Sequence, residues 1–266
     1  MLEMRNVNKA FATSAGKVLD DFNLSVRQGE FVSLIGPSGC GKTTALRIVA
    51  GLLNQSSGRV MVNGKESQGP SRDKAIVFQH FNLFPWRTAI DNVAYGLEIQ
   101  GMKKVERYRI AREYLELVGL SASEKQFPAQ LSGGMRQRIG IARALAIDPK
   151  LLLMDEPFGA LDALTREYLQ GQLARICEER RFTTLFVTHS IDEAIYLSDR
   201  VVVMGVQPGR IIAEFPIAMA KPRGDYNFRA EPEYARVREE IWKLLEAQIV
   251  RAEAALEEKA PQMVAS

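Results

Sequence analysis

The sequence predicts an α/β fold with an inserted helical segment, and three observations lead to this prediction. An apolar run of strand length, residues 30–35, is joined by a glycine-rich loop to a helix-periodic segment, residues 44–50. Two further apolar runs of strand length lie at residues 75–78 and 151–154. Between about residues 80 and 150 only helical patterns follow one another. We therefore expect a sheet core with helices inserted into it.

The loop at residues 36–44 reads Gly-Pro-Ser-Gly-Cys-Gly-Lys-Thr-Thr and fits the phosphate-loop pattern. Glycines let its backbone present N–H groups inward, and the helix start adds partial positive charge where a polyphosphate would bind. Lys42 is expected to reach the β- and γ-phosphates, and the Thr43 hydroxyl to coordinate Mg²⁺. The predicted nucleotide contacts are Gly36, Pro37, Ser38, Gly39, Cys40, Gly41, Lys42, Thr43 and Thr44.

Composition limits the classes of protein to consider. The 266 residues, 46% of them hydrophobic, suffice for one large core or for a core with a smaller subdomain. A net charge of only +3 argues against a dedicated nucleic-acid surface. The two cysteines cannot form a disulfide framework, and they fit a reducing cytoplasm. With no signal-peptide core and no apolar run that spans a bilayer, work at a membrane requires docking onto another chain.

The N-terminal part predicts an antiparallel subdomain. Residues 2–8 and 21–27 have strand patterns, the second alternating between polar and apolar residues, and a Gly/Ser/Ala hairpin loop at residues 12–16 lies between them. Residues 57–65 read as a strand and a turn. Phe11, at the edge of the hairpin loop, is either an adenine-stacking aromatic or a hydrophobic strand end.

Two carboxylates follow the strand at residues 151–154. Asp155 is expected to hold Mg²⁺ opposite Thr43, and Glu156 to polarise a water for attack on the γ-phosphate. Gln79 ends the strand at residues 75–78, where it either approaches the metal or the water, or is an ordinary loop residue.

The inserted segment predicts helices at residues 89–100, 105–118 and 135–147. Ser132 is the expected N-cap of the third, and with Gly133 and Gly134 it forms either an anion site or simply a capped helix start. Before the first helix, a loop carries Phe84, Pro85 and Trp86, which form either a docking surface or a loop folded onto its own core.

The C-terminal part begins with Asp162, the expected N-cap of a helix at residues 163–180. A β-branched strand at residues 183–188 ends at His189, which either lies at the γ-phosphate or is a surface histidine. A short helix at residues 191–197, a hairpin at residues 200–214 and a Pro- and Gly-rich linker at residues 216–232 follow. An amphipathic helix at residues 234–258 then presents Val237, Ile241, Leu244, Leu245 and Ile249 on one face.

Taken together, these motifs resemble the ATP-binding subunits of ABC transporters over nearly the whole chain. The phosphate loop is joined by Gln79 as the Q-loop, residues 131–134 (Leu-Ser-Gly-Gly) as the signature motif, residues 160–162 as the D-loop and His189 as the switch histidine. The resemblance implies a RecA-like P-loop NTPase core and makes Phe11 the adenine-stacking aromatic. Among the implied nucleotide contacts are Ser132, Gly133, Gly134 and Asp162, with Glu156, His189 and Gln79 in catalysis and Thr43, Gln79 and Asp155 at Mg²⁺. One departure is Met135, where the family usually has Gln.

The resemblance also implies partners. Two copies, or one copy and a close relative, would sandwich ATP between the phosphate loop of one and Ser132–Gly134 of the other, and closure would be a population shift driven by the nucleotide. Membrane permease subunits would dock near Phe84, Pro85 and Trp86 at the cytoplasmic face of the membrane, with a separate solute-binding protein in the same system. The residues near this loop look most like importers of nitrate, sulfonate or taurine.

Two other classes remain as alternatives. A soluble ABC-type ATPase would have two ATPase units or a coiled-coil or zinc insertion, and a phosphate-loop kinase would leave Ser132 and His189 without a role. We expect an ATPase domain at residues 1–220, with the helical insertion at about residues 80–150, followed by a linker and helical extension at residues 221–266.

Overall fold

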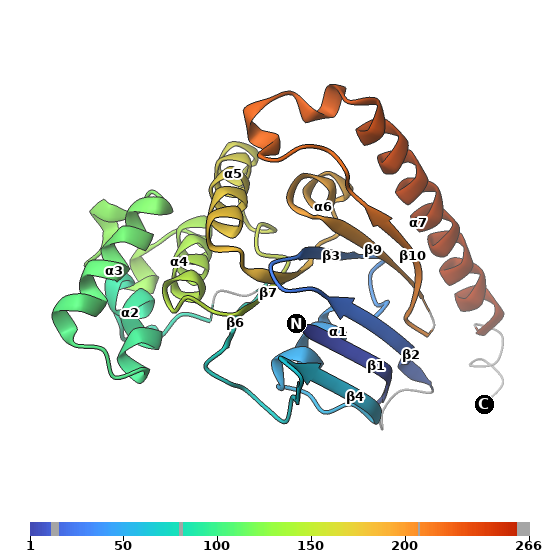
Figure 1. The fold of residues 1–266 in the computed structure, drawn as a ribbon, viewed down its shortest axis with the longest axis horizontal. Helices are drawn as coiled ribbons and strands as arrows, with labels where there is room; N and C mark the ends of the chain where they lie inside the picture. Colours follow the sequence, from blue (N-terminus) through green and yellow to red (C-terminus); the bar gives the residue numbers. More distant parts are fainter. Residues whose placement is uncertain (12–15, 80–81, 207, 260–266) are drawn as a thin grey trace. The chain divides into compact units, whose positions relative to one another are not determined.

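The computed structural model describes residues 1–11, 16–79, 82–206 and 208–259, with side chains to Ala252 (Figure 1). Most of the predicted hairpin loop at residues 12–16 lies outside this part of the chain, as do His80 and Phe81. Two compact units are present: residues 1–69 with 187–266, and residues 70–186. They are described separately below.

The antiparallel subdomain predicted in the first unit is present. Its strands pair in the order β2-β1-β4-β5, with the bounds β1 (Leu2–Ala10), β2 (Lys17–Val26), β4 (Ser57–Val62) and β5 (Lys65–Glu66). In β2, Leu19, Phe22, Leu24 and Val26 are buried and the residues between them are not. This alternation produces a sheet with one face in the core, as the sequence predicts.

The first unit also contains fully buried strands. β3 (Phe31–Ile35) pairs in parallel with β9 (Arg200–Gly205), and β10 (Arg210–Pro216) pairs antiparallel with β9. The helices of this unit include α1 (Lys42–Ala50) and α6 (Ile191–Leu197), and α6 packs on β3 and β9. All five side chains of β3 are buried, because β3 has covered faces on both sides.

The segment that we interpret from the sequence as a linker is in fact packed against the first unit. It contains η3 (Arg223–Asp225) and η4 (Phe228–Ala230), and its Ile217, Met219 and Phe228 join the core cluster of β9 and α6. Arg223 is 2% exposed, and its guanidinium donates to the carbonyls of residues 195, 196, 198, 217 and 219 at 2.8–3.2 Å. The Pro- and Gly-rich segment is therefore an ordered connection to α7 (Pro232–Lys259).

The second unit combines a short sheet with helices. β8 (Thr183–Val187), β7 (Leu151–Asp155) and β6 (Lys74–Val77) are neighbours in that order, β6 and β7 being parallel, and α5 (Ala163–Arg180) lies between β7 and β8 in sequence. Val187, the last residue of β8, falls within the first unit.

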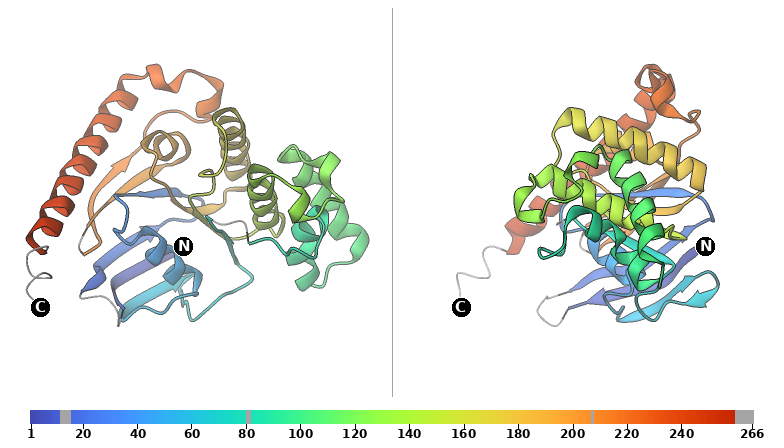
Figure 2. Two further views of the ribbon diagram at one scale, coloured as in Figure 1. Left: turned by 180° about the vertical axis from the view of Figure 1, so that it is seen from behind. Right: turned by 90° about the vertical axis from the view of Figure 1, so that its left-hand side faces the viewer.

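The helical insertion is confirmed. Among the described residues from 82 to 150 the structure has no strand, only α2 (Ala89–Ile99), α3 (Lys104–Leu117), η1 (Ser121–Ser123), η2 (Pro128–Gln130) and α4 (Gly133–Ala146). α2, α3 and α4 pack on one another, as the two views of Figure 2 show. Among the helices of the described residues, none combines the length and apolar character needed to cross a bilayer.

Candidate functional site

The phosphate loop connects β3 to α1 in a conformation that depends on its glycines. Gly41 has φ 97° in the left-handed region, and a Cβ at Gly36 would lie only 2.7 Å from Cys40 Sγ and 2.8 Å from the Met204 carbonyl oxygen. Gly41 also precedes α1 without offering a side chain to its first amides. The start of α1 is therefore able to accept an anion on its N–H groups.

The Lys42 side chain lies in the interior of the loop. It is buried, and its ammonium donates to the carbonyl oxygens of Gly36 at 2.7 Å and Pro37 at 3.0 Å. Cys40 Sγ lies 3.8 Å from the same ammonium, and burial raises the pKa of that thiol. Cys40 is therefore a packing residue of the loop rather than a nucleophile. The remaining loop residues are partly accessible: Pro37, Thr43 and Thr44 are half-buried, and Ser38 and Gly39 are exposed.

His189 lies beside this loop in the first unit. Thr188, the residue before it, donates its backbone N–H to Leu34 in β3 at 3.3 Å. His189 is exposed and lines one pocket together with Gly36, Pro37 and Ser38. The structure thus brings together two motifs that are separated by about 150 residues in sequence.

Three residues that our sequence interpretation missed fix the chain on either side of His189. Thr188 Oγ1 donates to the buried Glu193 carboxylate at 2.6 Å and accepts from the backbone N–H of Ser190 at 3.0 Å. Ser190 in turn caps α6, accepting from the Glu193 N–H at 3.3 Å. The signal was the Ser-x-x-Glu spacing of a capping box directly after the histidine.

Phe11 follows β1 in the first unit and is 37% exposed. Ala10 pairs with Lys17 on β2, and the next residue of β2, Val18, has its carbonyl oxygen 3.2 Å from where a Gly41 Cβ would lie. This puts Phe11 at the end of the sheet next to the phosphate loop. Lys9 Nζ lies 4.8 Å from the centre of the Phe11 ring, so a cation already contacts one aromatic face.

The carboxylate strand and the Q-loop residue meet in the second unit. β6 and β7 are parallel with Val77 opposite Met154, so Gln79 and Glu156 leave the sheet at matching positions. Gln79 Nε2 donates to Glu156 Oε2 at 3.1 Å. Asp155 is 3% exposed, whereas Glu156 is half-buried in the left-handed region at φ 47°. A non-glycine residue in this region is uncommon and turns the Glu156 side chain out of the strand alternation.

The signature residues and the D-loop also lie together in the second unit. Ser132 caps α4 by accepting from the Met135 N–H at 3.2 Å, and a Cβ at Gly134 would lie 3.3 Å from Leu161. Asp162 caps α5, accepting from the Thr165 N–H at 3.0 Å, and this bond lowers the pKa of the Asp162 carboxyl. Both N-cap predictions are confirmed. Gly133 and Met135, the other signature residues, are half-buried in the first turn of α4.

The loop with Phe84, Pro85 and Trp86 is both anchored and exposed. The buried Asn92 amide accepts from the Phe84 N–H at 2.8 Å and donates to carbonyl oxygens of residues 84, 87 and 88 at 3.0–3.2 Å. Trp86 is nevertheless 72% exposed, with its ring 5.7 Å from that of Phe84. Phe84 thus packs inward, as in the second reading of this loop, while Trp86 faces solvent and the docking surface stays a prediction.

The chain is similar to several known proteins. A family model described as "ABC transporter" matches residues 19–159. The chain is 47% identical to an uncharacterized ABC transporter ATP-binding protein of Methanocaldococcus jannaschii, covering 94% of this chain and 93% of the relative. It is 41% identical to a taurine import ATP-binding protein of Escherichia coli O157:H7, covering 90% and 95%. A solved dimeric ATP-binding cassette in a post-hydrolysis state with ADP and Pi is similar at 34% identity and a TM-score of 0.76, covering 83% and 100%.

Proposed function

Because this chain belongs to the ABC transporter family, as an ATP-binding subunit and ATPase with a P-loop NTPase fold, we propose that it is the motor of an importer. In this proposal, ATP-driven closure of a dimer is coupled to the uptake of a small anion of the taurine, sulfonate or nitrate kind. The observation that carries the solute class is the 41% identity to a taurine import ATP-binding protein over 95% of that relative.

The phosphate loop is the proposed ATP site. Residues 36–44 would surround the phosphates with backbone N–H groups, and Lys42 would transfer its ammonium from the Gly36 and Pro37 carbonyls to the β- and γ-phosphates. Phe11 would stack on the adenine with the ring face that Lys9 does not cover.

Three residues supply oxygen donors of the kind that Mg²⁺ prefers: the Thr43 hydroxyl, the Gln79 amide and the Asp155 carboxylate. Since Gln79 donates its Nε2 hydrogen to Glu156, its amide oxygen is the atom available for the ion. Bound there with ATP, Mg²⁺ would neutralise charge on the transferred phosphoryl group.

Glu156 is the proposed general base. Its carboxylate would take a proton from the attacking water, and the hydrogen bond from Gln79 would orient it for that step. His189 would contact the γ-phosphate from the side of the loop where Ser38 lies. Thr188 and Glu193 would hold the histidine without touching the nucleotide.

The second half of the ATP site would come from another copy, or from a close relative of this chain. Ser132, Gly133, Gly134 and Asp162 would contact the nucleotide held by the partner's phosphate loop. The similar cassette of known structure is a dimer, which supports this arrangement. Permease subunits would dock at Trp86 and its neighbours Phe84 and Pro85, placing the protein at the cytoplasmic face of the membrane, and a solute-binding protein would deliver the anion.

The proposal is tested by uptake in the native cell. In a strain lacking this gene, import of labelled taurine, an alkylsulfonate or nitrate is measured after complementation with wild-type protein, Lys42→Ala or Trp86→Ala. We expect wild type alone to restore import of one of these anions. Restored import by Lys42→Ala, or unchanged import of all three anions in the deletion strain, would contradict the proposal.

A second measurement separates the motor role from the solute class. Tagged Glu156→Gln protein is captured from detergent-solubilised native membranes with Mg-ATP, and its partners are identified by mass spectrometry. A polytopic membrane protein that is lost in the Glu156→Gln/Trp86→Ala variant supports the docking role of the loop. Capture of soluble proteins or nucleic acid alone would favour the soluble ATPase instead.

A further inference from the structure

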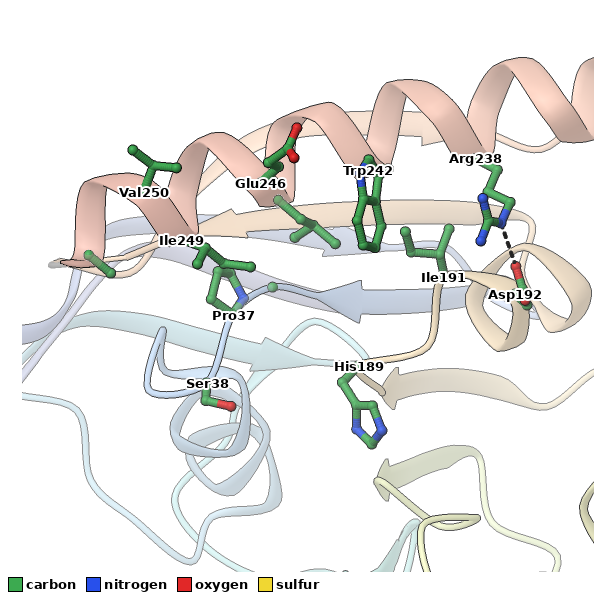
Figure 3. Close-up of a pocket in the computed structure, with 13 residues that line it drawn as sticks. Pro37, Ser38, His189, Ile191, Asp192, Arg238, Trp242, Glu246, Ile249 and Val250 are labelled. Atoms are coloured by element: carbon green, nitrogen blue, oxygen red, sulfur yellow. Dashed lines mark hydrogen bonds and ion pairs between the residues drawn. The ribbon is translucent and has the colours of Figure 1, made fainter. Parts of the chain in front are cut away.

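A cavity of about 770 Å³ lies between α7 and the phosphate loop, entirely within the first unit (Figure 3). On one side it is lined by Pro37, Ser38 and His189, and on the other by residues of α7 between 238 and 252. Trp242 projects from α7 into this space in Figure 3. The wall of this cavity is largely apolar, so its exposure to water is unfavourable. An apolar surface of another chain that covered the wall would remove this cost.

α7 is held firmly beside this cavity. Near one end, Tyr234 and Arg238 bind the Asp192 carboxylate at 2.8 and 3.1 Å. Near the other, the buried Gln248 accepts from the Val206 N–H at 3.3 Å. The helix that forms one wall of the cavity is therefore hydrogen-bonded to the rest of the unit at two places along its length.

The apolar face of α7 changes from buried to exposed along the helix. Val237 and Ile241 are in the core, but Trp242 is 54% exposed, and Ile249, which the sequence predicted on the same face as Val237, is 48% exposed. Trp242, Leu245 and Ile249, which we call the outer apolar face, follow the i, i+3, i+7 spacing of one helix side and all line the cavity. Leu245 is half-buried and also packs against the core cluster, but Trp242 and Ile249 on either side of it are open, and large apolar side chains exposed on one surface indicate a contact with another chain.

A second exposed apolar pair follows the D-loop in the other unit. Leu164 and Tyr168 are 81% and 52% exposed, and they lie one turn apart on α5, directly after Asp162. A Cβ at Gly134 would lie 3.3 Å from Leu161, so the D-loop lies against the start of α4, and the exposed pair follows that loop on the first turns of α5. Nothing within α5 itself explains two large apolar residues at these positions.

We propose that the outer apolar face of α7 packs against Leu164 and Tyr168 of a second copy in the ATP-bound dimer. This inference rests on the proposed function, in which the signature and D-loop surface of one copy covers the phosphate loop of the other. The cavity shares Pro37, Ser38 and His189 with that loop, so the proposed contact continues the same interface. In a two-fold dimer the contact occurs twice, since each copy contributes both patches.

The contact gives α7 a function in regulating closure. It forms only when two ATP-loaded copies meet, so it favours the closed state and lowers the dimer dissociation constant without changing how one copy binds ATP.

The test measures the Mg-ATP-dependent dimer of full-length Glu156→Gln protein by sedimentation velocity. Adding Trp242→Ala or Ile249→Ala is expected to raise the dimer dissociation constant about tenfold, the size typical of a truncated interface anchor. Lys243→Ala, on the solvent side of the same helix, and Val105→Ala, an exposed apolar residue of α3, are the matched controls. ATP affinity of the monomer, measured with a fluorescent analogue, should be unchanged in all four.

Cross-linking identifies the opposing surface and does not depend on the tryptophan variant folding. Chains carrying Leu164→Cys and Ile249→Cys, differently tagged in the Glu156→Gln background, are mixed and oxidised with and without Mg-ATP, Cys40 and Cys177 being buried. A mixed disulfide dimer that needs Mg-ATP is expected. Disulfides between two Ile249→Cys chains, or dimer constants that Trp242→Ala and Ile249→Ala leave unchanged, would overturn the inference. If the parent forms no dimer with Mg-ATP, the proposed ATP sandwich fails first, and the inference with it.

Discussion

The helices α1 and α4 both begin beside a glycine-rich motif, but they differ in whether a side chain accepts a hydrogen bond from their first backbone N–H groups. α1 begins after Gly41, which has no side chain to accept a hydrogen bond. α4 begins after Ser132, whose hydroxyl already accepts from the Met135 N–H. The first N–H groups of α1 therefore have no side-chain acceptor, whereas one of those of α4 already donates to Ser132; in the proposed dimer, α1 would bind a phosphate of its own chain's nucleotide and α4 one of the partner's. Binding and turnover of ATP should therefore be separable by mutation.

The largest expected effect is on turnover alone. Glu156→Gln removes the proposed general base, and we expect ATP hydrolysis to fall about 10²- to 10⁴-fold, the usual range for general-base catalysis. ATP affinity should remain, because α1 is untouched. Steady-state phosphate release and nucleotide binding are the two measurements, with Glu113→Gln on the exposed face of α3 as control. Hydrolysis near the wild-type rate would reject Glu156 as the base.

A smaller effect is expected on binding at α1. Lys42→Ala removes the ammonium that lies in the loop, and we expect ATP affinity to fall about 10- to 100-fold, since bonds to charged groups contribute about 1.5–3 kcal/mol. Equilibrium binding of a fluorescent ATP analogue measures this, with Lys65→Ala on the exposed strand β5 as control. Unchanged affinity would mean that the start of α1 is not the anion site.

Ser132→Ala tests the second helix start. Loss of the cap should destabilise the protein by about 1 kcal/mol, and Thr88→Ala, which removes the N-cap of α2, should cost a similar amount. Only Ser132→Ala should also reduce ATP hydrolysis, while both leave ATP binding by one chain intact. Urea unfolding and phosphate release separate the two effects. Equal hydrolysis in the two variants would mean that Ser132 is a cap and nothing more.

The smallest effect concerns the thiol inside the phosphate loop. Burial raises the pKa of Cys40, so at pH 7–8 the thiolate is scarce and alkylation by iodoacetamide should be slow compared with free cysteine. Raising the pH should speed the reaction, since the thiol deprotonates only as the pH rises towards its raised pKa. Mass spectrometry of the tryptic peptide follows the modification. Fast labelling at pH 7 would show that the loop opens more than its buried Lys42 and Cys40 indicate.

Local signals predicted much of the fold. Side-chain chemistry within a few residues determines the bounds of α5 and α6 and the N-caps Asp162 and Ser132, so the sequence predicts them. The sequence does not predict the packed segment before α7, because the burial of Arg223 depends on carbonyl oxygens of residues as distant as Ile195. At Ile249, helical periodicity predicts the apolar face correctly but does not predict how much of that face is covered.

The same distinction applies to the site. Lys42, Asp155 and Glu156 were assigned from their own patterns, whereas Gln79, Ser132 and His189 gained functional roles only from the family resemblance. The Gln79–Glu156 hydrogen bond follows from the register of two parallel strands. The support for His189 by Thr188 and Glu193 required knowing that a hydroxyl and a carboxylate are buried together. Assignment of the roles of these residues remains a prediction for the experiments above.

The buried amide of Asn92 has a mechanical consequence. Its four hydrogen bonds fix the loop that carries Trp86 to the first turn of α2, leaving no joint between them. α2 in turn packs along α4, the helix that begins at Ser132. A load applied at Trp86 would therefore act on the first turn of α2 as well as on the loop, and through α2 on the helix α4 that packs against it.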